Sequence, residues 1–385
     1  MGEGHHRPRV LFVTRNFPPL LGGMERLNWH LADELRGACE LRLVGPRGAA
    51  ALAPPSVAVR EVALQPLRNF LARAWWMAWR EALAWRPHLV LAGSGLTAPL
   101  AWWAARACGA RAAAYVHGLD LSVPHPVYRG LWRPALRRMD CVIANSSATA
   151  QLARGIGIAA QRISVVHPGT ELPMADRAAR ARFREAQGIA TDVPLLLSVG
   201  RLTERKGLRE FVTEVLPRVA QRHPTVLLAV VGEAPANALY GRAQSVLDIA
   251  DAARAAGVGA RLRMLGRLDE AALHDAYFAS DLHVFPIRDL PHDPEGFGMV
   301  AVEAAAHGLA SVAYACGGVA DAVGEGVSGH LVGPGDSAGF ADAVLRLLER
   351  PLPAEAVRGF AQAFAWPRFG RGVMRAVGLE CGDRG

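Results

Sequence analysis

The sequence predicts an α/β protein built from two doubly wound, parallel-sheet domains that face each other across a cleft. Its 385 residues exceed the size at which one hydrophobic core stops growing. Short apolar runs alternate with longer segments of helical period, which is typical of strand and helix repeats. The alternation pauses at the Pro/Gly turn 168–173, and we place the domain boundary there, between residues 172 and 173.

The expected strands are apolar runs bounded by turn residues. In the first domain they lie near Arg9–Thr14, Glu40–Val44, Val57–Val62, His88–Leu91, Arg111–Val116, Cys141–Ala144 and Ile163–Val166. In the second they lie near Pro194–Val199, Val226–Val231, Arg261–Leu265, Leu282–Phe285, Ala310–Ala313 and His330–Val332. Ligands of such sheets bind beyond the carboxyl ends of the strands, so the loops after strands should carry the chemistry.

The cysteines and the amino-terminal residues favour a cytoplasmic protein. The five cysteines lie far apart, with no Cys-x-x-Cys pair and no metal-ligand spacing, and we interpret them as reduced thiols. Residues 1–8 are polar and lead straight into an apolar strand, which is not the pattern of an export signal. The uncharged stretch Pro87–Ala105 is broken by glycines and Pro99, so it predicts strand, turn and helix rather than a membrane span.

Charge is unevenly divided between the two halves. Residues 1–172 contain 20 arginines and 10 acidic residues, whereas the remainder contains 23 basic and 25 acidic residues. A basic first half suggests an anionic partner there, whether lipid, nucleic acid or phosphorylated acceptor. The sequence has no recognisable nucleic-acid-reading motif, so we do not expect a nucleic-acid partner.

Two adjacent glycines, Gly22 and Gly23, follow the first strand and precede a helix expected over Met24–Leu35. Such a turn lets backbone N–H groups approach an anion, and the helix dipole favours negative charge there. A diphosphate would suit this turn, although an ordinary tight turn has the same sequence.

A buried strand of the second domain ends at Gly200 and delivers two cations, Arg201 and Lys206, to its carboxyl end. Lys206 is the only lysine in a chain that otherwise uses arginine for every fixed positive charge. Pre-placed cations stabilise a departing pyrophosphate more in the transition state than in the ground state. We therefore interpret this loop as a phosphate site rather than as a solvated basic loop.

Two glutamates lie eight positions apart, Glu295 on a Gly-rich turn and Glu303 in the helix expected after it. At this spacing they do not share a helical face in the i, i+4 sense, so we interpret them as carboxylates that serve different parts of one elongated ligand. Glu295 and the amides of residues 296–298 would hold sugar hydroxyls. Glu303 would accept hydrogen bonds from a ribose diol.

The strand-Gly-Arg-x4-Lys-Gly and Glu-x7-Glu segments, in this order and about 90 residues apart, resemble the retaining GT-B glycosyltransferases of family 4. Further similar segments cover nearly the whole chain: Phe17–Glu25, His117–Gly118, Asn145–Ser146, Leu265–Leu268 and Ser328–Asp336. The resemblance implies a hexosyltransferase that uses a nucleoside-diphosphate sugar and no cofactor. Residues 1–172 would form the acceptor-side domain, 173–363 the donor-binding domain, and 364–385 would pack back on the first domain.

The resemblance also assigns roles by position. Gly22, Gly23, Arg201 and Lys206 would contact the donor phosphates, Glu295 the transferred sugar, and Glu303 the ribose. The further donor-binding residues that it implies are Arg267, Leu268, Gly296, Phe297, Gly298, Met299 and Val300. His117 would lie beside the sugar, so that the catalytic candidates are His117, Arg201, Lys206 and Glu295, with Asp120, Asn145 and Ser146 as secondary candidates.

No metal is implied, because no Asp-x-Asp motif lies at an expected strand end and Asp289 and Asp293 are separated by three residues. Arg201 and Lys206 would take the role that a metal plays in other enzymes. Double displacement needs a carboxylate beside the anomeric carbon, whereas Glu295 is expected at the distal hydroxyls. We therefore expect same-face attack, with the leaving phosphate taking the acceptor proton.

The segment Leu67–Arg86 is expected to form an amphipathic helix. Its apolar stripe would consist of Leu67, Leu71, Ala74, Trp75, Ala78, Trp79 and Ala82, opposite Asn69, Arg73 and Arg80. The helix would either lie on an anionic bilayer or pack on its own sheet. A second basic stretch that favours the bilayer contains Tyr128, Arg129, Trp132, Arg133, Arg137 and Arg138. The expected acceptor is a glycan or lipid-linked molecule of cell-envelope polysaccharide, lipopolysaccharide or glycolipid synthesis, met at the inner face of the membrane.

The donor and the alternatives stay open. The Glu295–Val300 stretch and the acidic, proline-rich loop before it look most like bacterial mannosyltransferases, so GDP-mannose or a related deoxyhexose leads and a UDP-sugar is second. The rival functions are a sugar-nucleotide epimerase of similar architecture, a glucosyl or N-acetylglucosaminyl transferase acting on a soluble acceptor, and a non-catalytic membrane scaffold.

Overall fold

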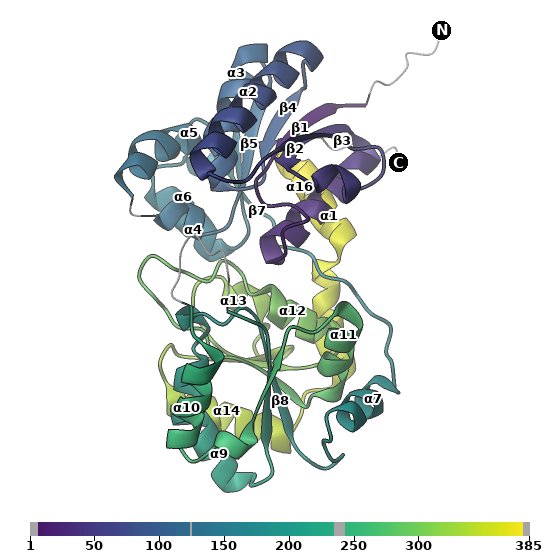
Figure 1. Ribbon diagram of the computed structural model, residues 1–385, viewed down its shortest axis with the longest axis vertical. Coiled ribbons are helices and arrows are strands. Elements are labelled where there is room, and N and C mark those ends of the chain that lie inside the picture. Colours follow the sequence, from purple (N-terminus) through teal and green to yellow (C-terminus); the bar gives the residue numbers. More distant parts are fainter. Residues whose placement is uncertain (1–6, 124, 235–242, 380–385) are drawn as a thin grey trace. The chain divides into compact units, whose positions relative to one another are not determined.

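The computed structural model describes residues 7–123, 125–234 and 243–379. The chain divides into two compact units: the first runs to Gly169 and resumes at Trp366, and the second is Thr170–Ala365. Each unit contains one parallel sheet with helices packed on it (Figure 1). The prediction of two doubly wound, parallel-sheet domains is confirmed.

The first unit contains a seven-stranded sheet in the order β3-β2-β1-β4-β5-β6-β7, with parallel pairs throughout. Its strands are β1 Arg9–Val13, β2 Glu40–Pro46, β3 Ala58–Val62, β4 Leu89–Ala92, β5 Arg111–Val116, β6 Cys141–Ala144 and β7 Ile163–Val165. Its α-helices are α1 Gly23–Ala38, α2 Leu67–Trp85, α3 Ala98–Cys108, α4 Leu119–Ser122, α5 Arg133–Arg137, α6 Ser147–Gly155 and α16 Trp366–Ala376. The strand order reverses between β1 and β4, which is where such sheets bind ligands.

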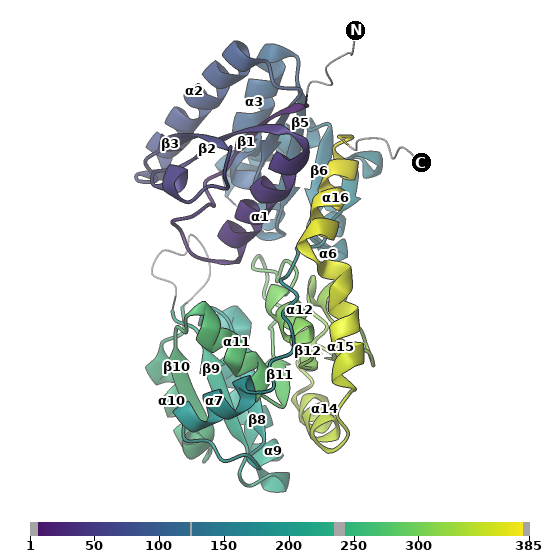
Figure 2. The same cartoon turned by 90° about the vertical axis from the view of Figure 1, so that its right-hand side faces the viewer.

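Helices cover both faces of this first sheet. Helices α2 and α3 lie together on one face, and α1 and α16 lie side by side on the other (Figures 1 and 2). The ring of Trp366, at the start of α16, stacks on His30 of α1 with 3.8 Å between the ring centroids. The last described helix of the chain therefore belongs to the first unit.

The second unit contains a six-stranded parallel sheet in the order β10-β9-β8-β11-β12-β13. Its strands are β8 Leu195–Val199, β9 Leu227–Val231, β10 Leu262–Gly266, β11 Leu282–Phe285, β12 Ser311–Tyr314 and β13 Gly329–Val332. Its α-helices are α7 Ala179–Ala186, α8 Leu208–Glu210, α9 Leu216–Arg222, α10 Val246–Ala255, α11 Glu270–Ala279, α12 Met299–Ala306, α13 Val319–Ala322, α14 Ser337–Glu349 and α15 Ala354–Ala361. Strand β8 is buried along its whole length, as a central strand must be.

Helix α2 packs on the sheet with most of the predicted stripe, but not with its tryptophans. Its buried residues are Phe70, Ala74, Ala78, Ala82 and Trp85. Trp75 and Trp79, which the prediction placed on the same stripe as the alanines, are exposed. The small alanines let the helix approach the sheet closely, and the bulky indoles next to them remain at the surface. The predicted stripe was therefore wrong for Trp75 and Trp79, whereas Leu67 and Leu71 pack against the core beside the buried alanines, as predicted.

The uncharged stretch Pro87–Ala105 forms β4, a turn and the first part of α3, as predicted. Among the described residues, no helix combines the length and the apolar character that crossing a membrane requires.

Candidate active site

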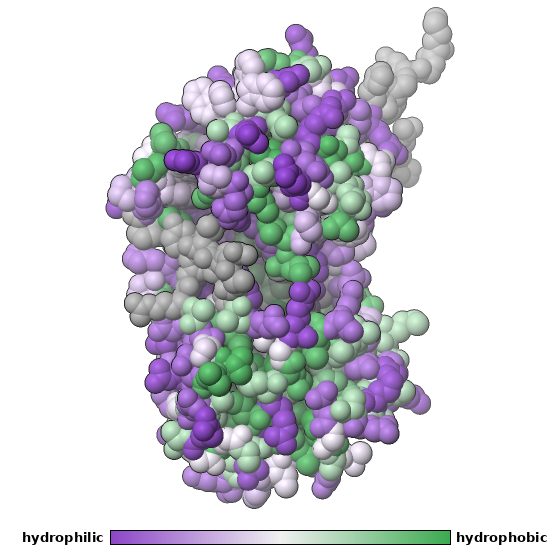
Figure 3. Space-filling model, in the orientation of Figure 1, coloured by the Kyte–Doolittle hydropathy of each residue, from purple (hydrophilic) through white to green (hydrophobic). Residues whose placement is uncertain are grey.

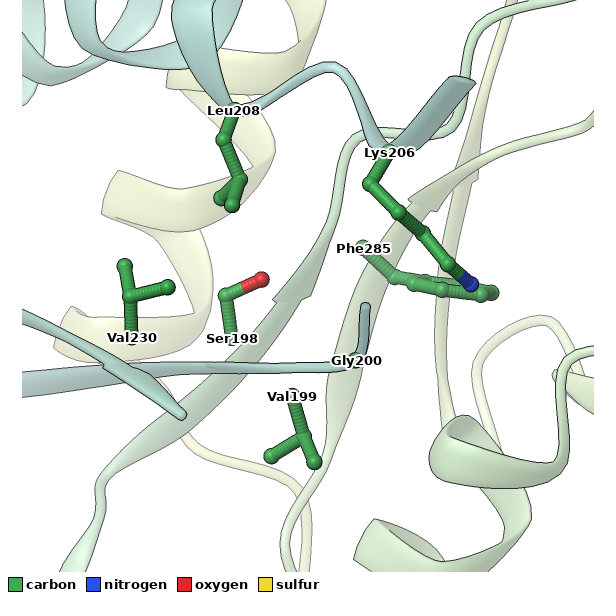
Figure 4. Close-up of a pocket in the computed structure, with 7 residues that line it drawn as sticks. All are labelled: Ser198, Val199, Gly200, Lys206, Leu208, Val230 and Phe285. Carbon is green, nitrogen blue, oxygen red and sulfur yellow. The ribbon is translucent and has the colours of Figure 1, made fainter. Parts of the chain in front are cut away.

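Lys206 stands at the carboxyl end of the central strand of the second sheet. Strand β8 ends at Val199, and the chain passes Gly200 into a short turn, Glu204–Lys206, that brings the lysine back over the strand end. Its Nζ lies 2.9 Å from Oε2 of Glu295 and 4.7 Å from the centroid of the Phe285 ring. In Figure 4 the lysine side chain runs toward that ring, above a small cavity at Gly200.

The turn that carries Lys206 requires glycine at its end. Gly207 has a φ of +66°, and a side chain there would overlap the carbonyl oxygen of Pro286. This close approach presses the turn after β8 against the loop after β11. The two loops are therefore held together at the point where the charged side chains meet.

Glu295 is paired with two cations, Lys206 and the neighbouring Arg205. Nε of Arg205 also lies 3.3 Å from a carboxylate oxygen of Asp293. Burial alone would raise the pKa of Glu295, but the charges of Arg205, Lys206 and Arg201 outweigh it and lower the pKa to about 2. Burial lowers the pKa of Lys206, an effect that Glu295 opposes. Removing these charges largely from water costs free energy, and their pairing offsets that desolvation cost.

The loop around Glu295 is fixed by the glycines after β12. The backbone N–H of Gly318 donates to the carbonyl of Glu295 at 2.9 Å. A side chain on Gly318 would overlap the carbonyl oxygen of Gly296, and Gly317 has a φ of +53°. Gly317 and Gly318 therefore let two loops from neighbouring strands touch through their backbones.

Helix α12 begins beside this loop and carries the second predicted glutamate. Gly298 caps the helix with a φ of +105°, which favours glycine, and Met299 and Val300 form its first turn. The first N–H groups of a helix have no partner within it and can bind an anion. Phe297 is buried against Phe364. Glu303 is buried on α12, where its Oε2 accepts a hydrogen bond of 3.1 Å from the hydroxyl of Tyr277.

The remaining predicted residues of this unit divide into two exposed arginines and two partly buried apolar side chains. Arg201 and Arg267 are exposed. Arg201 still acts on the site through its charge, which lowers the pKa of Glu295. Leu268 and Val300 pack against the apolar cluster that contains Tyr277 and Ala304, on the same side of the sheet as Glu303. The structure thus brings Lys206 and Glu295 into contact, and it gives Arg267 no described contact with them.

The turn at Gly22 and Gly23 is flanked by a carboxylate from the helix that follows it, α1. Glu25, in the first turn of α1, places a carboxylate oxygen where a side chain on Gly22 would lie. Its other oxygen accepts a hydrogen bond of 2.8 Å from Nδ2 of Asn16. Gly23 begins the helix. An anion that approached these glycines would meet the carboxylate of Glu25 as a neighbour.

His117 follows β5, at the carboxyl edge of the first sheet. Its Nε2 lies 3.2 Å from the carbonyl oxygen of Gly93, which follows β4. Since a carbonyl only accepts, Nε2 carries the proton in this hydrogen bond. The backbone N–H of His117 donates to Asp120 at 3.1 Å. The imidazole is thus oriented by the backbone after β4, and the carboxylate of Asp120 holds the backbone of His117.

Among the secondary candidates, Ser146 has a structural use. Its hydroxyl accepts from the backbone N–H of Thr149 at 3.1 Å and caps α6. Asn145 is buried at the end of β6.

The second basic stretch also has internal uses. Nε1 of Trp132 donates to the carbonyl of Leu96 at 2.9 Å, and Arg137 donates to the carbonyl of Ile156. Tyr128 is buried. The prediction that this stretch forms a membrane-facing surface was therefore wrong for Tyr128, whereas Arg129, Arg137 and Arg138 are exposed.

Two residues of the candidate site, Arg205 and Tyr277, were not predicted from the sequence. Arg205 escaped because the spacing of the family motif drew attention to Arg201 and Lys206, although three cations within six residues were a visible signal. Tyr277 had no such signal, because it sits in an ordinary helix 26 residues before Glu303. Within the described residues, no three His, Cys, Asp or Glu side chains gather as a metal site would require.

Comparisons with known proteins give each half of the chain a match. Residues 193–350 match the family model described as glycosyl transferases group 1, and residues 21–172 match that of glycosyltransferase family 4. D-inositol 3-phosphate glycosyltransferase 2 from Catenulispora acidiphila is 34% identical over 216 residues, which are 55% of this chain and 48% of that protein. D-inositol 3-phosphate glycosyltransferase from Mycolicibacterium smegmatis is 32% identical, with 63% of this chain and 54% of that protein covered. The chain spans about half the length of these curated relatives.

Solved structures share the fold over nearly the whole chain. HepE of Anabaena in complex with UDP superposes with a TM-score of 0.79 at 22% identity, covering 97% of this chain and 100% of that one. WaaG, a glycosyltransferase involved in lipopolysaccharide biosynthesis, does so with a TM-score of 0.70 at 16% identity, covering 97% and 100%. At these identities the likeness concerns the fold alone.

Proposed function

We propose, on the premise that this chain belongs to the GT-B glycosyltransferases, that it transfers a hexose from a nucleoside-diphosphate sugar to an acceptor and retains the anomeric configuration. The observation that carries the proposal is the half-buried contact between Lys206 and Glu295 at the carboxyl end of β8, with Arg205 beside it. This is where a doubly wound sheet binds its ligand.

Lys206 and Arg201 would receive the charge that develops on the leaving diphosphate. In the chain without ligand the ammonium of Lys206 is already neutralised by Glu295. A bound diphosphate would draw Lys206 toward itself and leave a carboxylate oxygen of Glu295 able to accept from sugar hydroxyls. The pair therefore keeps both groups charged and in place until the donor arrives, and no metal is needed for this step.

The other predicted donor contacts fit an extended nucleotide along the sheet edge. Glu303 would take the ribose, and the first turn of α12 would face the phosphates through its free N–H groups. Gly22, Gly23 and His117 would act from the first unit, the glycines on the donor phosphates and His117 on a sugar hydroxyl. Because Glu295 is committed to cations rather than placed as a nucleophile, we propose same-face attack in which the leaving phosphate takes the acceptor proton.

Two donors are proposed, a GDP-sugar as the first candidate and a UDP-sugar as the second. The residues Glu295–Val300 favour GDP-mannose or a related deoxyhexose. UDP and UDP-glucose are bound by the solved Anabaena structures, which supports a UDP-sugar as the second pair. The acceptor is proposed to be anionic, because the first 172 residues carry the basic excess. The curated relatives named for inositol 3-phosphate support a phosphorylated polyol beside the lipid-linked glycan.

A thermal-shift screen with GDP, UDP and their sugars tests the donor. A ligand at about one hundred times its dissociation constant should add roughly 2.7 kcal/mol to the stability of the unit that binds it. The partner base at the same concentration should add less. Incubation with the chosen sugar nucleotide without acceptor then separates the transferase from the epimerase, since an epimerase forms product alone. A chain that no nucleotide stabilises would refute the donor assignment.

A specific surface supports the accompanying proposal that the protein works against an anionic bilayer at the cytoplasmic side. On α2 and α3, Trp75, Trp76, Trp79 and Trp103 are 43%, 46%, 38% and 55% exposed. The guanidinium of Arg80 lies 4.6 Å from the ring centroid of Trp76. In Figure 3 strongly hydrophilic residues mix with pale and green ones over α2. Exposed indoles beside arginines suit the interface of anionic lipids.

Sedimentation with vesicles tests this surface. The unsubstituted chain should pellet with phosphatidylglycerol vesicles and stay in solution with phosphatidylcholine vesicles. Replacement of Trp75, Trp76 and Trp79 by serine should abolish pelleting, while thermal unfolding stays nearly unchanged because these side chains are exposed. Equal pelleting of the triple variant would remove the membrane proposal and leave the transferase proposal intact.

A further inference from the structure

A tyrosine from a different helix holds the glutamate proposed to bind the ribose. The hydroxyl of Tyr277, on α11, donates to Oε2 of Glu303, on α12, at 3.1 Å. Both residues are buried, the tyrosine with 2% and the glutamate with 9% of its surface exposed. The bond therefore links two helices away from bulk solvent, where water cannot replace it.

His307 packs on the ring of Tyr277, and His274 holds His307 in place. The ring of His307 stacks on Tyr277 with 4.7 Å between centroids, and its Nδ1 lies 2.7 Å from the carbonyl oxygen of Glu303. Since the carbonyl accepts, Nδ1 carries the proton. Burial, with the neighbouring His274 as a second cause, lowers the pKa of His307 to about 3, so the ring is neutral at pH 7.

Neutral His307 has an acceptor at Nε2, and Nδ1 of His274 lies 2.9 Å from it. His274 therefore donates in this contact. The hydrogen-bond chain therefore runs from His274 to His307 and from His307 to the carbonyl of Glu303, with the first residue donating in each bond. The ring stacked on Tyr277 cannot turn over without breaking two hydrogen bonds.

This arrangement matters for a carboxylate that must bind a diol. A glutamate side chain has three rotatable bonds, and fixing it in one rotamer costs conformational entropy. A diol is bound best when both carboxylate oxygens face it in one orientation, and each oxygen has two lone pairs. The hydroxyl of Tyr277 uses one lone pair of Oε2 and restricts the plane of the carboxylate before any ligand binds.

We propose that Tyr277 is a positioning residue, which orients the carboxylate of Glu303 so that the site prefers a ribonucleotide over its 2′-deoxy counterpart. The proposal rests on the proposed function, since it presumes that a nucleoside diphosphate lies on α12. Tyr277 does not itself contact the nucleotide. Its effect should therefore appear only when the ligand carries the hydroxyl that Glu303 accepts from.

Isothermal titration of the full chain with UDP, GDP and their 2′-deoxy forms tests this. The unsubstituted chain should bind the ribo form of its preferred nucleotide more tightly than the deoxy form. Tyr277→Phe keeps the ring and removes the hydroxyl, and it should weaken binding of the ribo form by about five- to tenfold, the worth of one hydrogen bond. Binding of the deoxy form should change by less than about twofold, because the two losses are coupled.

Tyr314→Phe is the matched control. It also removes a hydroxyl from a buried tyrosine of the second unit, but that hydroxyl bonds Ser337 rather than Glu303. Its binding of both nucleotide forms should equal that of the unsubstituted chain. Equal losses for the ribo and deoxy forms in Tyr277→Phe, or no loss in either, would overturn the positioning role. If the unsubstituted chain binds neither UDP nor GDP, the proposed function fails as well, and this is seen before any substitution is made.

Discussion

The carboxyl edges of the two sheets have the same architecture and different chemistry. At the edge of the second sheet, the half-buried carboxylate of Glu295 pairs with the cations of Lys206 and Arg205. At the edge of the first sheet, the carboxylates of Glu25 and Asp120 accept from neutral N–H groups, those of the Asn16 amide and the His117 backbone. One edge concentrates charge, and the other presents hydrogen bonds.

The difference shows that total charge is a poor guide to where charge does chemistry. The first 172 residues hold the basic excess, yet much of it lies on helix surfaces such as that of α2. The remainder of the chain has two more acidic than basic residues, yet it places two cations on one half-buried carboxylate. A leaving diphosphate needs focused charge, whereas a sugar hydroxyl needs a well-placed neutral partner.

The sharpest way to break this comparison is to remove Lys206. Lys206→Ala should lower kcat because it raises the activation free energy by about 2.7–4 kcal/mol, the loss seen when a preorganised charge-stabilising donor is removed. Steady-state kinetics with the best donor and its acceptor measure this loss.

Arg254→Ala is the control, because Arg254 pairs with Asp251 on an exposed helix of the same unit and should cost little. Unchanged turnover in Lys206→Ala would show that the charged edge is structural and would withdraw the phosphate assignment.

The second test asks whether the charged edge also carries stability. The pKa of Glu295 is about 2 in the folded chain against an ordinary value of 4.5, so its contribution is present above pH 4.5 and is lost as the pH falls toward 2. The advantage of the unsubstituted chain over Glu295→Gln in free energy of unfolding should shrink by on the order of 2 kcal/mol between pH 5 and pH 3. Urea unfolding at each pH measures it, and a constant difference would contradict the pairing.

The smallest effect is expected at the edge of the first sheet. His117→Ala should lower kcat/KM by about fivefold, the worth of one hydrogen bond to an uncharged partner. His117→Gln, which retains an N–H donor, should recover part of the loss. A loss of about a hundredfold or more in both variants would mean that His117 transfers a proton, and the contrast between the two edges would then be false.

The sequence alone determined the sheets and the loops that matter. Runs such as Leu195–Val199 are apolar except for Ser198 and lie between turn residues. This pattern can be recognised within about ten residues because a central parallel strand is buried on both faces. The single lysine and the Glu-x7-Glu spacing indicated the loops after β8 and β11 as the candidate site, because ligands of such sheets bind at the carboxyl ends of the strands.

Only the tertiary structure decided which side chains meet. Lys206 and Glu295 are 89 residues apart, and Tyr277 and Glu303 are 26 apart, so their contacts depend on strand order and helix packing rather than on local pattern. The same limit misplaced Trp75 and Trp79, because a helical period shows that an apolar stripe exists and not which of two adjacent stripes the sheet accepts. Periodicity depends on neighbouring residues in the sequence. The contacts of a charged side chain or an indole depend instead on how elements distant in the sequence pack around it.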